Sequence, residues 1–289
     1  MTSSRRFRFV QVEYPWALGP EPGRYTIREH LGEGPRHILV LAVLGAPERR
    51  RLARRHRRAR DAAPEPPPEP VTTSRATLID AIALEGQEAA DRWLRATDVA
   101  AAAAEGIARL NRVLHAQRIA TADPYARDVS LPQALAVRVG YGTGEHVADG
   151  RWDRARELSR AAAGGTRRGG RAALRPQERL AAALGARDAL LAGEELTLRA
   201  RSDVDAERWR EAALQLGLAF ETALAELEPW REVTGLSARL DELHARGDDI
   251  RAAAGAALQG GLEQHDIAVV RTALGRLEAA LRARTAGGI

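Results

Sequence analysis

The strongest chemical signal in the sequence is a cluster of arginines between residues 48 and 60. This stretch, ERRRLARRHRRAR, carries eight guanidinium groups, at Arg49, Arg50, Arg51, Arg54, Arg55, Arg57, Arg58 and Arg60. Guanidinium groups bind phosphate through paired hydrogen bonds, and each phosphate they neutralise releases counterions. The cluster therefore predicts salt-dependent, sequence-independent binding to nucleic-acid phosphates, and RRGGR at 167–171 would add a second contact.

Other uses of the same cluster remain open. No aromatic residue is interleaved among these arginines, so stacking on bases is not expected. The run is equally typical of a solvated segment beside a linker, of a contact for the acidic C-terminal half of the chain, or of a patch for an acidic partner or a lipid surface.

One glycine-rich segment, GYGTGEHV at 140–147, resembles part of a dinucleotide-binding loop. Gly140 and Gly142 follow an apolar run, but Glu145 stands where the third glycine is required, and its carboxylate would repel a pyrophosphate. The segment predicts a tight β-turn and no nucleotide site.

Metal and covalent chemistry find little support. In DELH, Asp241 and His244 lie one helical turn apart, but no second pair completes a di-metal site; LEQH places Glu263 and His265 on different helical faces. The chain has no cysteine, no lysine and no G-x-S-x-G motif, which excludes thiolate sites, a P-loop and a hydrolase elbow. We therefore expect no enzymatic activity, no catalytic residues, no metal and no cofactor, although paired carboxylates cannot be recognised from one sequence.

The elements that must position these residues begin with a short antiparallel β element at 1–46. RFRFVQVEY and GRYTIRE have the composition and alternation of strands, and HILVLAVL is the continuous apolar run of a doubly covered strand. Residues 47–76 follow as an Arg-rich arm and a linker with five prolines in seven residues.

The remainder of the chain is predicted to be helical in two blocks, 77–175 and 176–289. The first contains a sustained heptad over 85–120 and a short β and glycine-rich insertion, with ALAVRV at 134–139 as a strand. The second is acidic, with long helices at 206–228 and 262–284 and shorter ones at 176–200, 237–246 and 248–259. The candidate helix-interface residues are Trp93, Ile107, Leu110, Leu114, Trp209, Leu216 and Phe220.

Charge distribution and hydropathy indicate where in the cell the protein would be found. Residues 1–175 hold 30 arginines against 20 acidic residues, whereas 176–289 hold 14 against 19. No apolar run approaches the roughly 18 residues of a membrane helix, and no apolar region follows the N-terminal arginines as an export signal requires. We expect a cytoplasmic protein without a membrane span.

Together these patterns predict a mainly α protein, an Ala/Leu-rich bundle or stack of helical hairpins with a small N-terminal β element. Two hypotheses for its function follow. The first is a non-enzymatic interaction or scaffold protein that binds a protein partner or itself through helix–helix contacts. The alternative is a nucleic-acid-associated protein that binds phosphates non-specifically through the arm at 49–60.

Overall fold

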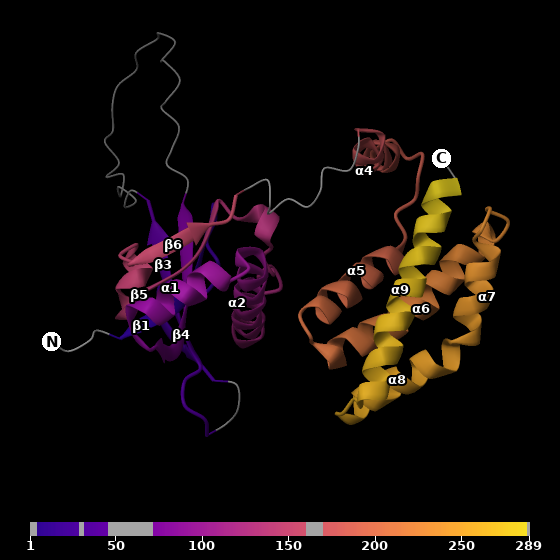
Figure 1. Cartoon of the computed structure of the whole chain (residues 1–289). Coiled ribbons are helices and arrows are strands. Elements are labelled where there is room, and N and C mark those ends of the chain that lie inside the picture. The colour runs from indigo at the N-terminus through magenta and orange to yellow at the C-terminus, as the bar shows by residue number, and fades with distance from the viewer. Residues whose placement is uncertain (1–4, 29–31, 46–71, 160–169, 288–289) are drawn as a thin grey trace, which may run out of the picture. The chain divides into compact units, whose positions relative to one another are not determined.

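The chain forms two compact units, Met1–Arg167 and Arg168–Ile289 (Figure 1). The structure, a computed structural model, describes residues 5–28, 32–45, 72–159 and 170–287. The Arg-rich arm lies outside these described residues.

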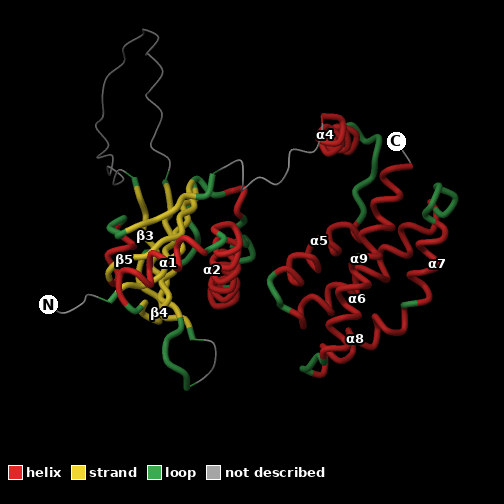
Figure 2. The backbone as a smooth tube through the Cα atoms, in the orientation of Figure 1, coloured by secondary structure: helices red, strands yellow, loops and turns green. Residues whose placement is uncertain are grey.

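Unit 1 is built on a six-stranded antiparallel sheet (Figure 2). Its strands are β1 (Arg6–Tyr14), β2 (Gly23–Ile27), β3 (His37–Leu44), β4 (Thr73–Leu84), β5 (Ala136–Thr143) and β6 (Arg154–Glu157). They lie in the order β2-β3-β4-β1-β5-β6, so the first strand of the chain is central and β6 forms one edge. The three strands expected within residues 5–45 are confirmed.

Two helices, α1 (Gly86–Ala96) and α2 (Val99–Thr121), follow β4. The expected continuous heptad over 85–120 is broken between them, because the Asp98 carboxylate accepts hydrogen bonds from the N–H groups of Ala100 (2.9 Å) and Ala101 (3.2 Å). This N-cap satisfies the free amides at the start of α2 and allows the chain to change direction there.

Both helices pack on the same face of the sheet. Alternate residues of the inner strands face them, and these contact Ile107, Leu110 and Leu114 of α2 in one buried cluster. Gly106 lets α2 approach closely, since a Cβ at this position would lie 2.7 Å from Val10 Cγ1.

The opposite face is covered by the 3-10 helix η2 (Gly144–Asp149). Val147 packs on Phe9 and Ile79 there. Gln11 is fully buried under this cover, and its side-chain amide donates to Thr77 Oγ1 (2.9 Å) and to the Val147 carbonyl (3.2 Å). A second 3-10 helix, η1 (Leu131–Gln133), precedes β5.

Unit 2 is helical throughout its described part. Its elements are α4 (Gly170–Leu184), α5 (Ala192–Asp205), α6 (Trp209–Leu227), η3 (Glu228–Trp230), α7 (Ser237–Ala245), α8 (Gly247–Gln259) and α9 (Gln264–Gly287). Leu216 and Phe220 of α6 are fully buried among α5, α8 and α9, and Trp209 packs at the edge of the same core. The single helix expected over 176–200 is instead two helices, α4 and α5.

The expectation of a mainly α fold with a small β element is wrong. Helices hold 56% of the structure and the six-stranded sheet holds 19%, which makes this an α+β fold with a sizeable sheet. The strand expected at 134–139 is confirmed in part by β5. The error lies in β4 and β6, because the alanines and leucines of β4 suit a helix as well as a strand, and β6 is only four residues long.

Two glycines inside the helices of unit 2 lower its stability. A Cβ at Gly255 in α8 or Gly275 in α9 would meet nothing within 4 Å. Replacing either with alanine should raise the free energy of unfolding by about 0.5–1 kcal/mol, because alanine loses less backbone entropy on folding. Urea unfolding followed by far-UV circular dichroism measures this.

Gly193 in α5 provides the opposite case for the same experiment. A Cβ there would lie 2.8 Å from Ala223 Cα of α6, so Gly193→Ala should destabilise the unit by about 1–3 kcal/mol. A gain of stability in all three variants would contradict the close α5–α6 approach.

Candidate functional site

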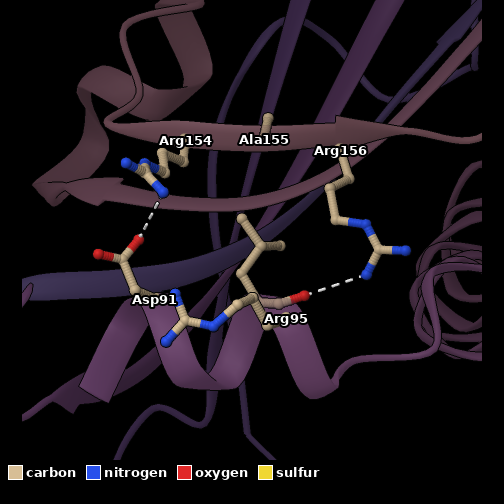
Figure 3. A pocket seen from close by; sticks show the side chains of 6 residues that line it. Asp91, Arg95, Arg154, Ala155 and Arg156 are labelled. Carbon is tan, nitrogen blue, oxygen red and sulfur yellow. Dashed lines mark hydrogen bonds and ion pairs between the residues drawn. The ribbon is translucent and has the colours of Figure 1, made fainter. Parts of the chain in front are cut away.

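A hollow of about 420 Å³ lies between α1 and the edge strand β6 (Figure 3). Its lining residues are Asp91, Leu94, Arg95, Arg154, Ala155 and Arg156. Three of these six side chains are cationic and one is anionic, so an excess of positive charge converges on a single concavity.

The strand alternation of β6 places two of the arginines. Arg154 pairs with Tyr141 and Arg156 with Val139, and both partners on β5 face the helices. Since side chains on one face of a strand recur every second residue, Arg154 and Arg156 both point toward α1.

The end of α1 anchors Arg156. Its Nη1 donates to the carbonyl oxygens of Leu94 (3.1 Å) and Thr97 (2.9 Å), which are at the C-terminal end of the helix. These carbonyls have no partner inside the helix and carry the negative end of its dipole, which favours a bound cation. Nε and Nη2 of Arg156 make no hydrogen bond within the described residues, so they are available to a ligand.

Asp91 forms an ion pair with Arg154 and holds its guanidinium in place. Its Nη1 lies 3.3 Å from Asp91 Oδ1 while 63% of its side chain stays exposed. Behind it, the buried Tyr141 hydroxyl donates to the same carboxylate oxygen at 2.5 Å, and Gln87 Nε2 donates to the Tyr141 oxygen at 2.6 Å. This chain of hydrogen bonds fixes the carboxylate under the guanidinium.

The same contacts set the ionisation of the site. The hydrogen bond from Tyr141 holds the pKa of the Asp91 carboxyl below its usual value; partial burial opposes this, and the charge of Arg154 adds to it. Burial raises the pKa of Tyr141, and the hydrogen bond to Asp91 raises it further. At neutral pH Asp91 is therefore an anion and Tyr141 a neutral donor, so neither is poised for proton transfer.

Arg95 completes the group from α1, one turn beyond Asp91. It is exposed and makes no hydrogen bond within the described residues, so its planar fork of donors is available. Leu94 supplies an apolar wall, whereas the Ala155 side chain points away from the hollow (Figure 3) and packs near Phe9 and Val147 on the other face of the sheet. The hollow combines fixed and free guanidinium groups, which is the arrangement that binds carboxylate or phosphate.

Most residues singled out from the sequence lie elsewhere. Arg49–Arg60 lies outside the described residues. Ile107, Leu110 and Leu114 are buried against the sheet, Leu216 and Phe220 are buried inside unit 2, and Trp93 of α1 lies beneath the Arg8 guanidinium. None of the described ones lines the hollow, and the sequence alone does not identify the arginines of β6. Their sequence signal, the alternation in RARE at 154–157, is only four residues long.

The two glycines of the presumed loop have a packing role. Gly140 and Gly142 lie within β5, so the expected tight turn there is wrong. A Cβ on Gly140 would lie 2.8 Å from Ala155 Cα, and one on Gly142 would lie 2.7 Å from Val147 Cγ1. They are glycines because β6 and η2 pass directly over them.

The other sequence candidates are held in structural contacts. Asp241 Oδ1 accepts from Arg231 Nη1 at 2.8 Å, and His244 Nδ1 is 2.8 Å from the Leu240 carbonyl oxygen. Among the described residues, no three His, Asp or Glu side chains group as metal ligands would. A search of the same residues finds no helix long and apolar enough to cross a membrane.

No protein-family model, curated protein or solved structure matches this chain.

Proposed function

We propose that this chain is a non-enzymatic interaction protein, and that its N-terminal unit captures an anionic group of a partner in the hollow between α1 and β6. The observation that carries the proposal is the convergence of Arg95, Arg154 and Arg156 on one concavity, opposed by a single carboxylate. Bound anions of this kind are carboxylates and phosphates, because both match the guanidinium fork.

The interaction surface proposed here is the hollow, in place of the apolar faces of the helices. The heptad side chains of α2 and α6 are buried in the cores of their own units, where they contribute stability. The arginines of the hollow remain accessible, with Arg154 63% exposed. Because they are solvated, binding should weaken as salt concentration rises.

Calorimetric titration of the full chain with inorganic pyrophosphate tests the proposal. The double variant Arg154→Gln/Arg156→Gln should bind about 10-fold or more weakly, because each hydrogen bond to a charged group contributes about 1.5–3 kcal/mol. The matched control is Arg112→Gln/Arg127→Gln, which removes two exposed charges of the same unit away from the hollow. Equal weakening in the control would show a general charge effect and contradict the proposal.

Substitution of Asp91 should change the affinity for pyrophosphate in the opposite direction. Asp91→Asn removes the one negative charge of the hollow while keeping an oxygen that accepts from Tyr141. Affinity for pyrophosphate should rise about three-fold or more, as expected for removing a like charge about 6 Å away near a protein surface. Weaker binding in this variant would count against an anion in the hollow.

The second candidate function is nucleic-acid association through Arg49–Arg60. β3 and β4 remain paired up to Leu44 and Thr73. The two strand ends that border the arm therefore lie side by side. Removing residues 48–60 should therefore leave the sheet register intact. Fluorescence anisotropy at low and moderate salt compares how the full chain and the deletion variant bind duplex DNA and RNA. Loss of tight binding in the deletion variant would support binding through the arm. Persistence of tight binding would contradict it.

A further inference from the structure

We propose that β6 accepts an extended acidic segment of a partner protein as a seventh strand, with carboxylates at alternate positions reaching the arginines of the hollow. This inference rests on the proposed function and names the class of partner. It combines two features that meet at β6, an open sheet edge and two arginines on one face.

The open edge comes from the sheet order. Among the described strands, β6 lies at the end of the sheet order and pairs with β5 alone. Leu158 N–H donates inward to the Val137 carbonyl at 2.9 Å, so Arg156, two residues earlier, also directs its backbone groups toward β5. The backbone groups of Ala155 and Glu157 then point away from the sheet, and no group of the described residues pairs with them. Such an edge is the template for strand addition.

The side-chain register specifies the ligand. Arg154 and Arg156 are two residues apart on one face, about 6.6–6.8 Å along the strand. An added strand places its own alternate side chains about 4.5–5.5 Å from these, on the same face. Acidic residues at positions i and i+2 of the added strand would therefore each lie beside one arginine, within reach of Arg95 across the hollow.

The observations favour a peptide over a nucleic acid. The outward backbone groups of β6 match the amides of a strand, and the hollow contains no aromatic side chain on which a base could stack. The described residues of unit 1 hold 17 arginines against 15 acidic residues, so the positive charge is local to the hollow rather than spread over a long track. The short, charged β6 also discourages indiscriminate pairing.

The other edge strand lacks these features. In β2, the Arg24 guanidinium is already paired with Glu145 at 2.6 Å, and β2 does not border the hollow. Specific capture of an acidic segment is therefore assigned to the β6 edge alone among the described strands.

Fluorescence anisotropy of the full chain with a labelled eight-residue peptide that alternates glutamate and threonine tests the inference. Glu157→Pro removes an outward N–H without touching the ladder to β5, and should weaken peptide binding about 5-fold or more. The matched control Glu157→Ala loses the same carboxylate but keeps the N–H, so it should bind the acidic peptide at least as tightly as the unaltered chain does. Pyrophosphate affinity should stay within about two-fold in both variants, since neither changes the guanidinium groups that bind it.

A second measurement uses the unaltered protein and avoids any effect on folding. Two versions of the peptide are N-methylated, one at every glutamate and one at every threonine, which blocks opposite edges of an extended strand. Strand addition requires that one version lose binding and the other keep it. If both bind like the parent peptide while Arg154→Gln/Arg156→Gln still weakens it, strand addition is wrong and the anion site stands. If a single-stranded oligonucleotide binds more tightly than the peptide and ignores Glu157→Pro, the partner class is wrong.

Discussion

Gly140→Ala should separate β6 from β5 and weaken pyrophosphate binding at the hollow. The added methyl group would meet the Arg154 carbonyl oxygen and lie 2.8 Å from Ala155 Cα. Both are backbone atoms of the partner strand, so no side-chain rotation relieves the clash. We expect binding to weaken about 10-fold or more, as with loss of both β6 arginines, and stability to fall by about 1–3 kcal/mol.

Calorimetry and hydrogen exchange together check this outcome. The amides of β6 that face β5 should lose protection in the variant, because their partners have moved away. Gly34→Ala is the control, since a Cβ there meets nothing within 4 Å. Normal binding with a protected β6 in Gly140→Ala would show that the hollow does not depend on this close approach.

Arg284→Ala should destabilise unit 2 by about 3–5 kcal/mol, the usual cost of removing one partner from a buried ion pair. The Arg284 side chain is only 3% exposed, and its Nη2 donates to Asp188 Oδ1 at 2.7 Å and to the Ala189 carbonyl at 3.0 Å. Glu194 lies 3.7 Å from Nη1. The guanidinium also lies 4.9 Å from the centre of the Trp230 ring.

Without Arg284, Arg179 would be the one cationic partner left to the two carboxylates among the described residues, although Glu194 Oε2 also accepts from the Leu191 N–H at 3.1 Å. Arg179 Nη2 donates to both oxygens of Glu194, at 2.6 and 2.7 Å, and its Nε donates to Asp188 at 3.3 Å. One half-buried guanidinium then faces two largely buried anions. Urea unfolding at 222 nm measures the loss, with Arg282→Ala as control: its side chain is 68% exposed, so its removal should change stability by less than about 0.5 kcal/mol. Equal effects would contradict the buried network.

Acidification offers an independent check of this network. Burial tends to raise the pKa of Asp188, but the hydrogen bonds and charges of Arg179 and Arg284 outweigh it and lower that pKa. Because the folded-state pKa lies below the unfolded one, the stabilisation is complete above about pH 4 and is lost as the pH falls through the folded value. Arg284→Ala should therefore lose less stability on acidification than the unaltered chain.

The predicted and unpredicted strands differ in composition. β1, β2 and β3 contain aromatic and β-branched residues in alternation, and the sequence alone placed them correctly. β4 reads TSRATLIDAIAL, in which the alanines and leucines suit a helix as well as a strand. Only its position between β1 and β3, with Leu78 toward the helices and Ile79 toward η2, makes it a strand.

The hollow could not be predicted because β6 exists only through its partner. Four residues are too few to define a strand by pattern, so RARE alone does not predict β6. Trp152 lies 5.5 Å from Phe9, ring centre to ring centre, on the face covered by η2. Gly140 is needed because the β6 backbone passes close to it. The sequence alone does not show which backbone segment lies against a glycine.

Although β1 is made before the other strands, it is central in the sheet and is paired on both sides only after β5 has been made. Arg6 pairs with Thr143, so β1 lacks one of its two neighbours until β5 has been made. The helical unit has a shorter delay, because its largest interface joins α5 and α6, which are adjacent in sequence. Contacts over long sequence separations form slowly. During translation, the apolar residues of β1 are therefore expected to wait longer for their last neighbour than those of α5 and α6.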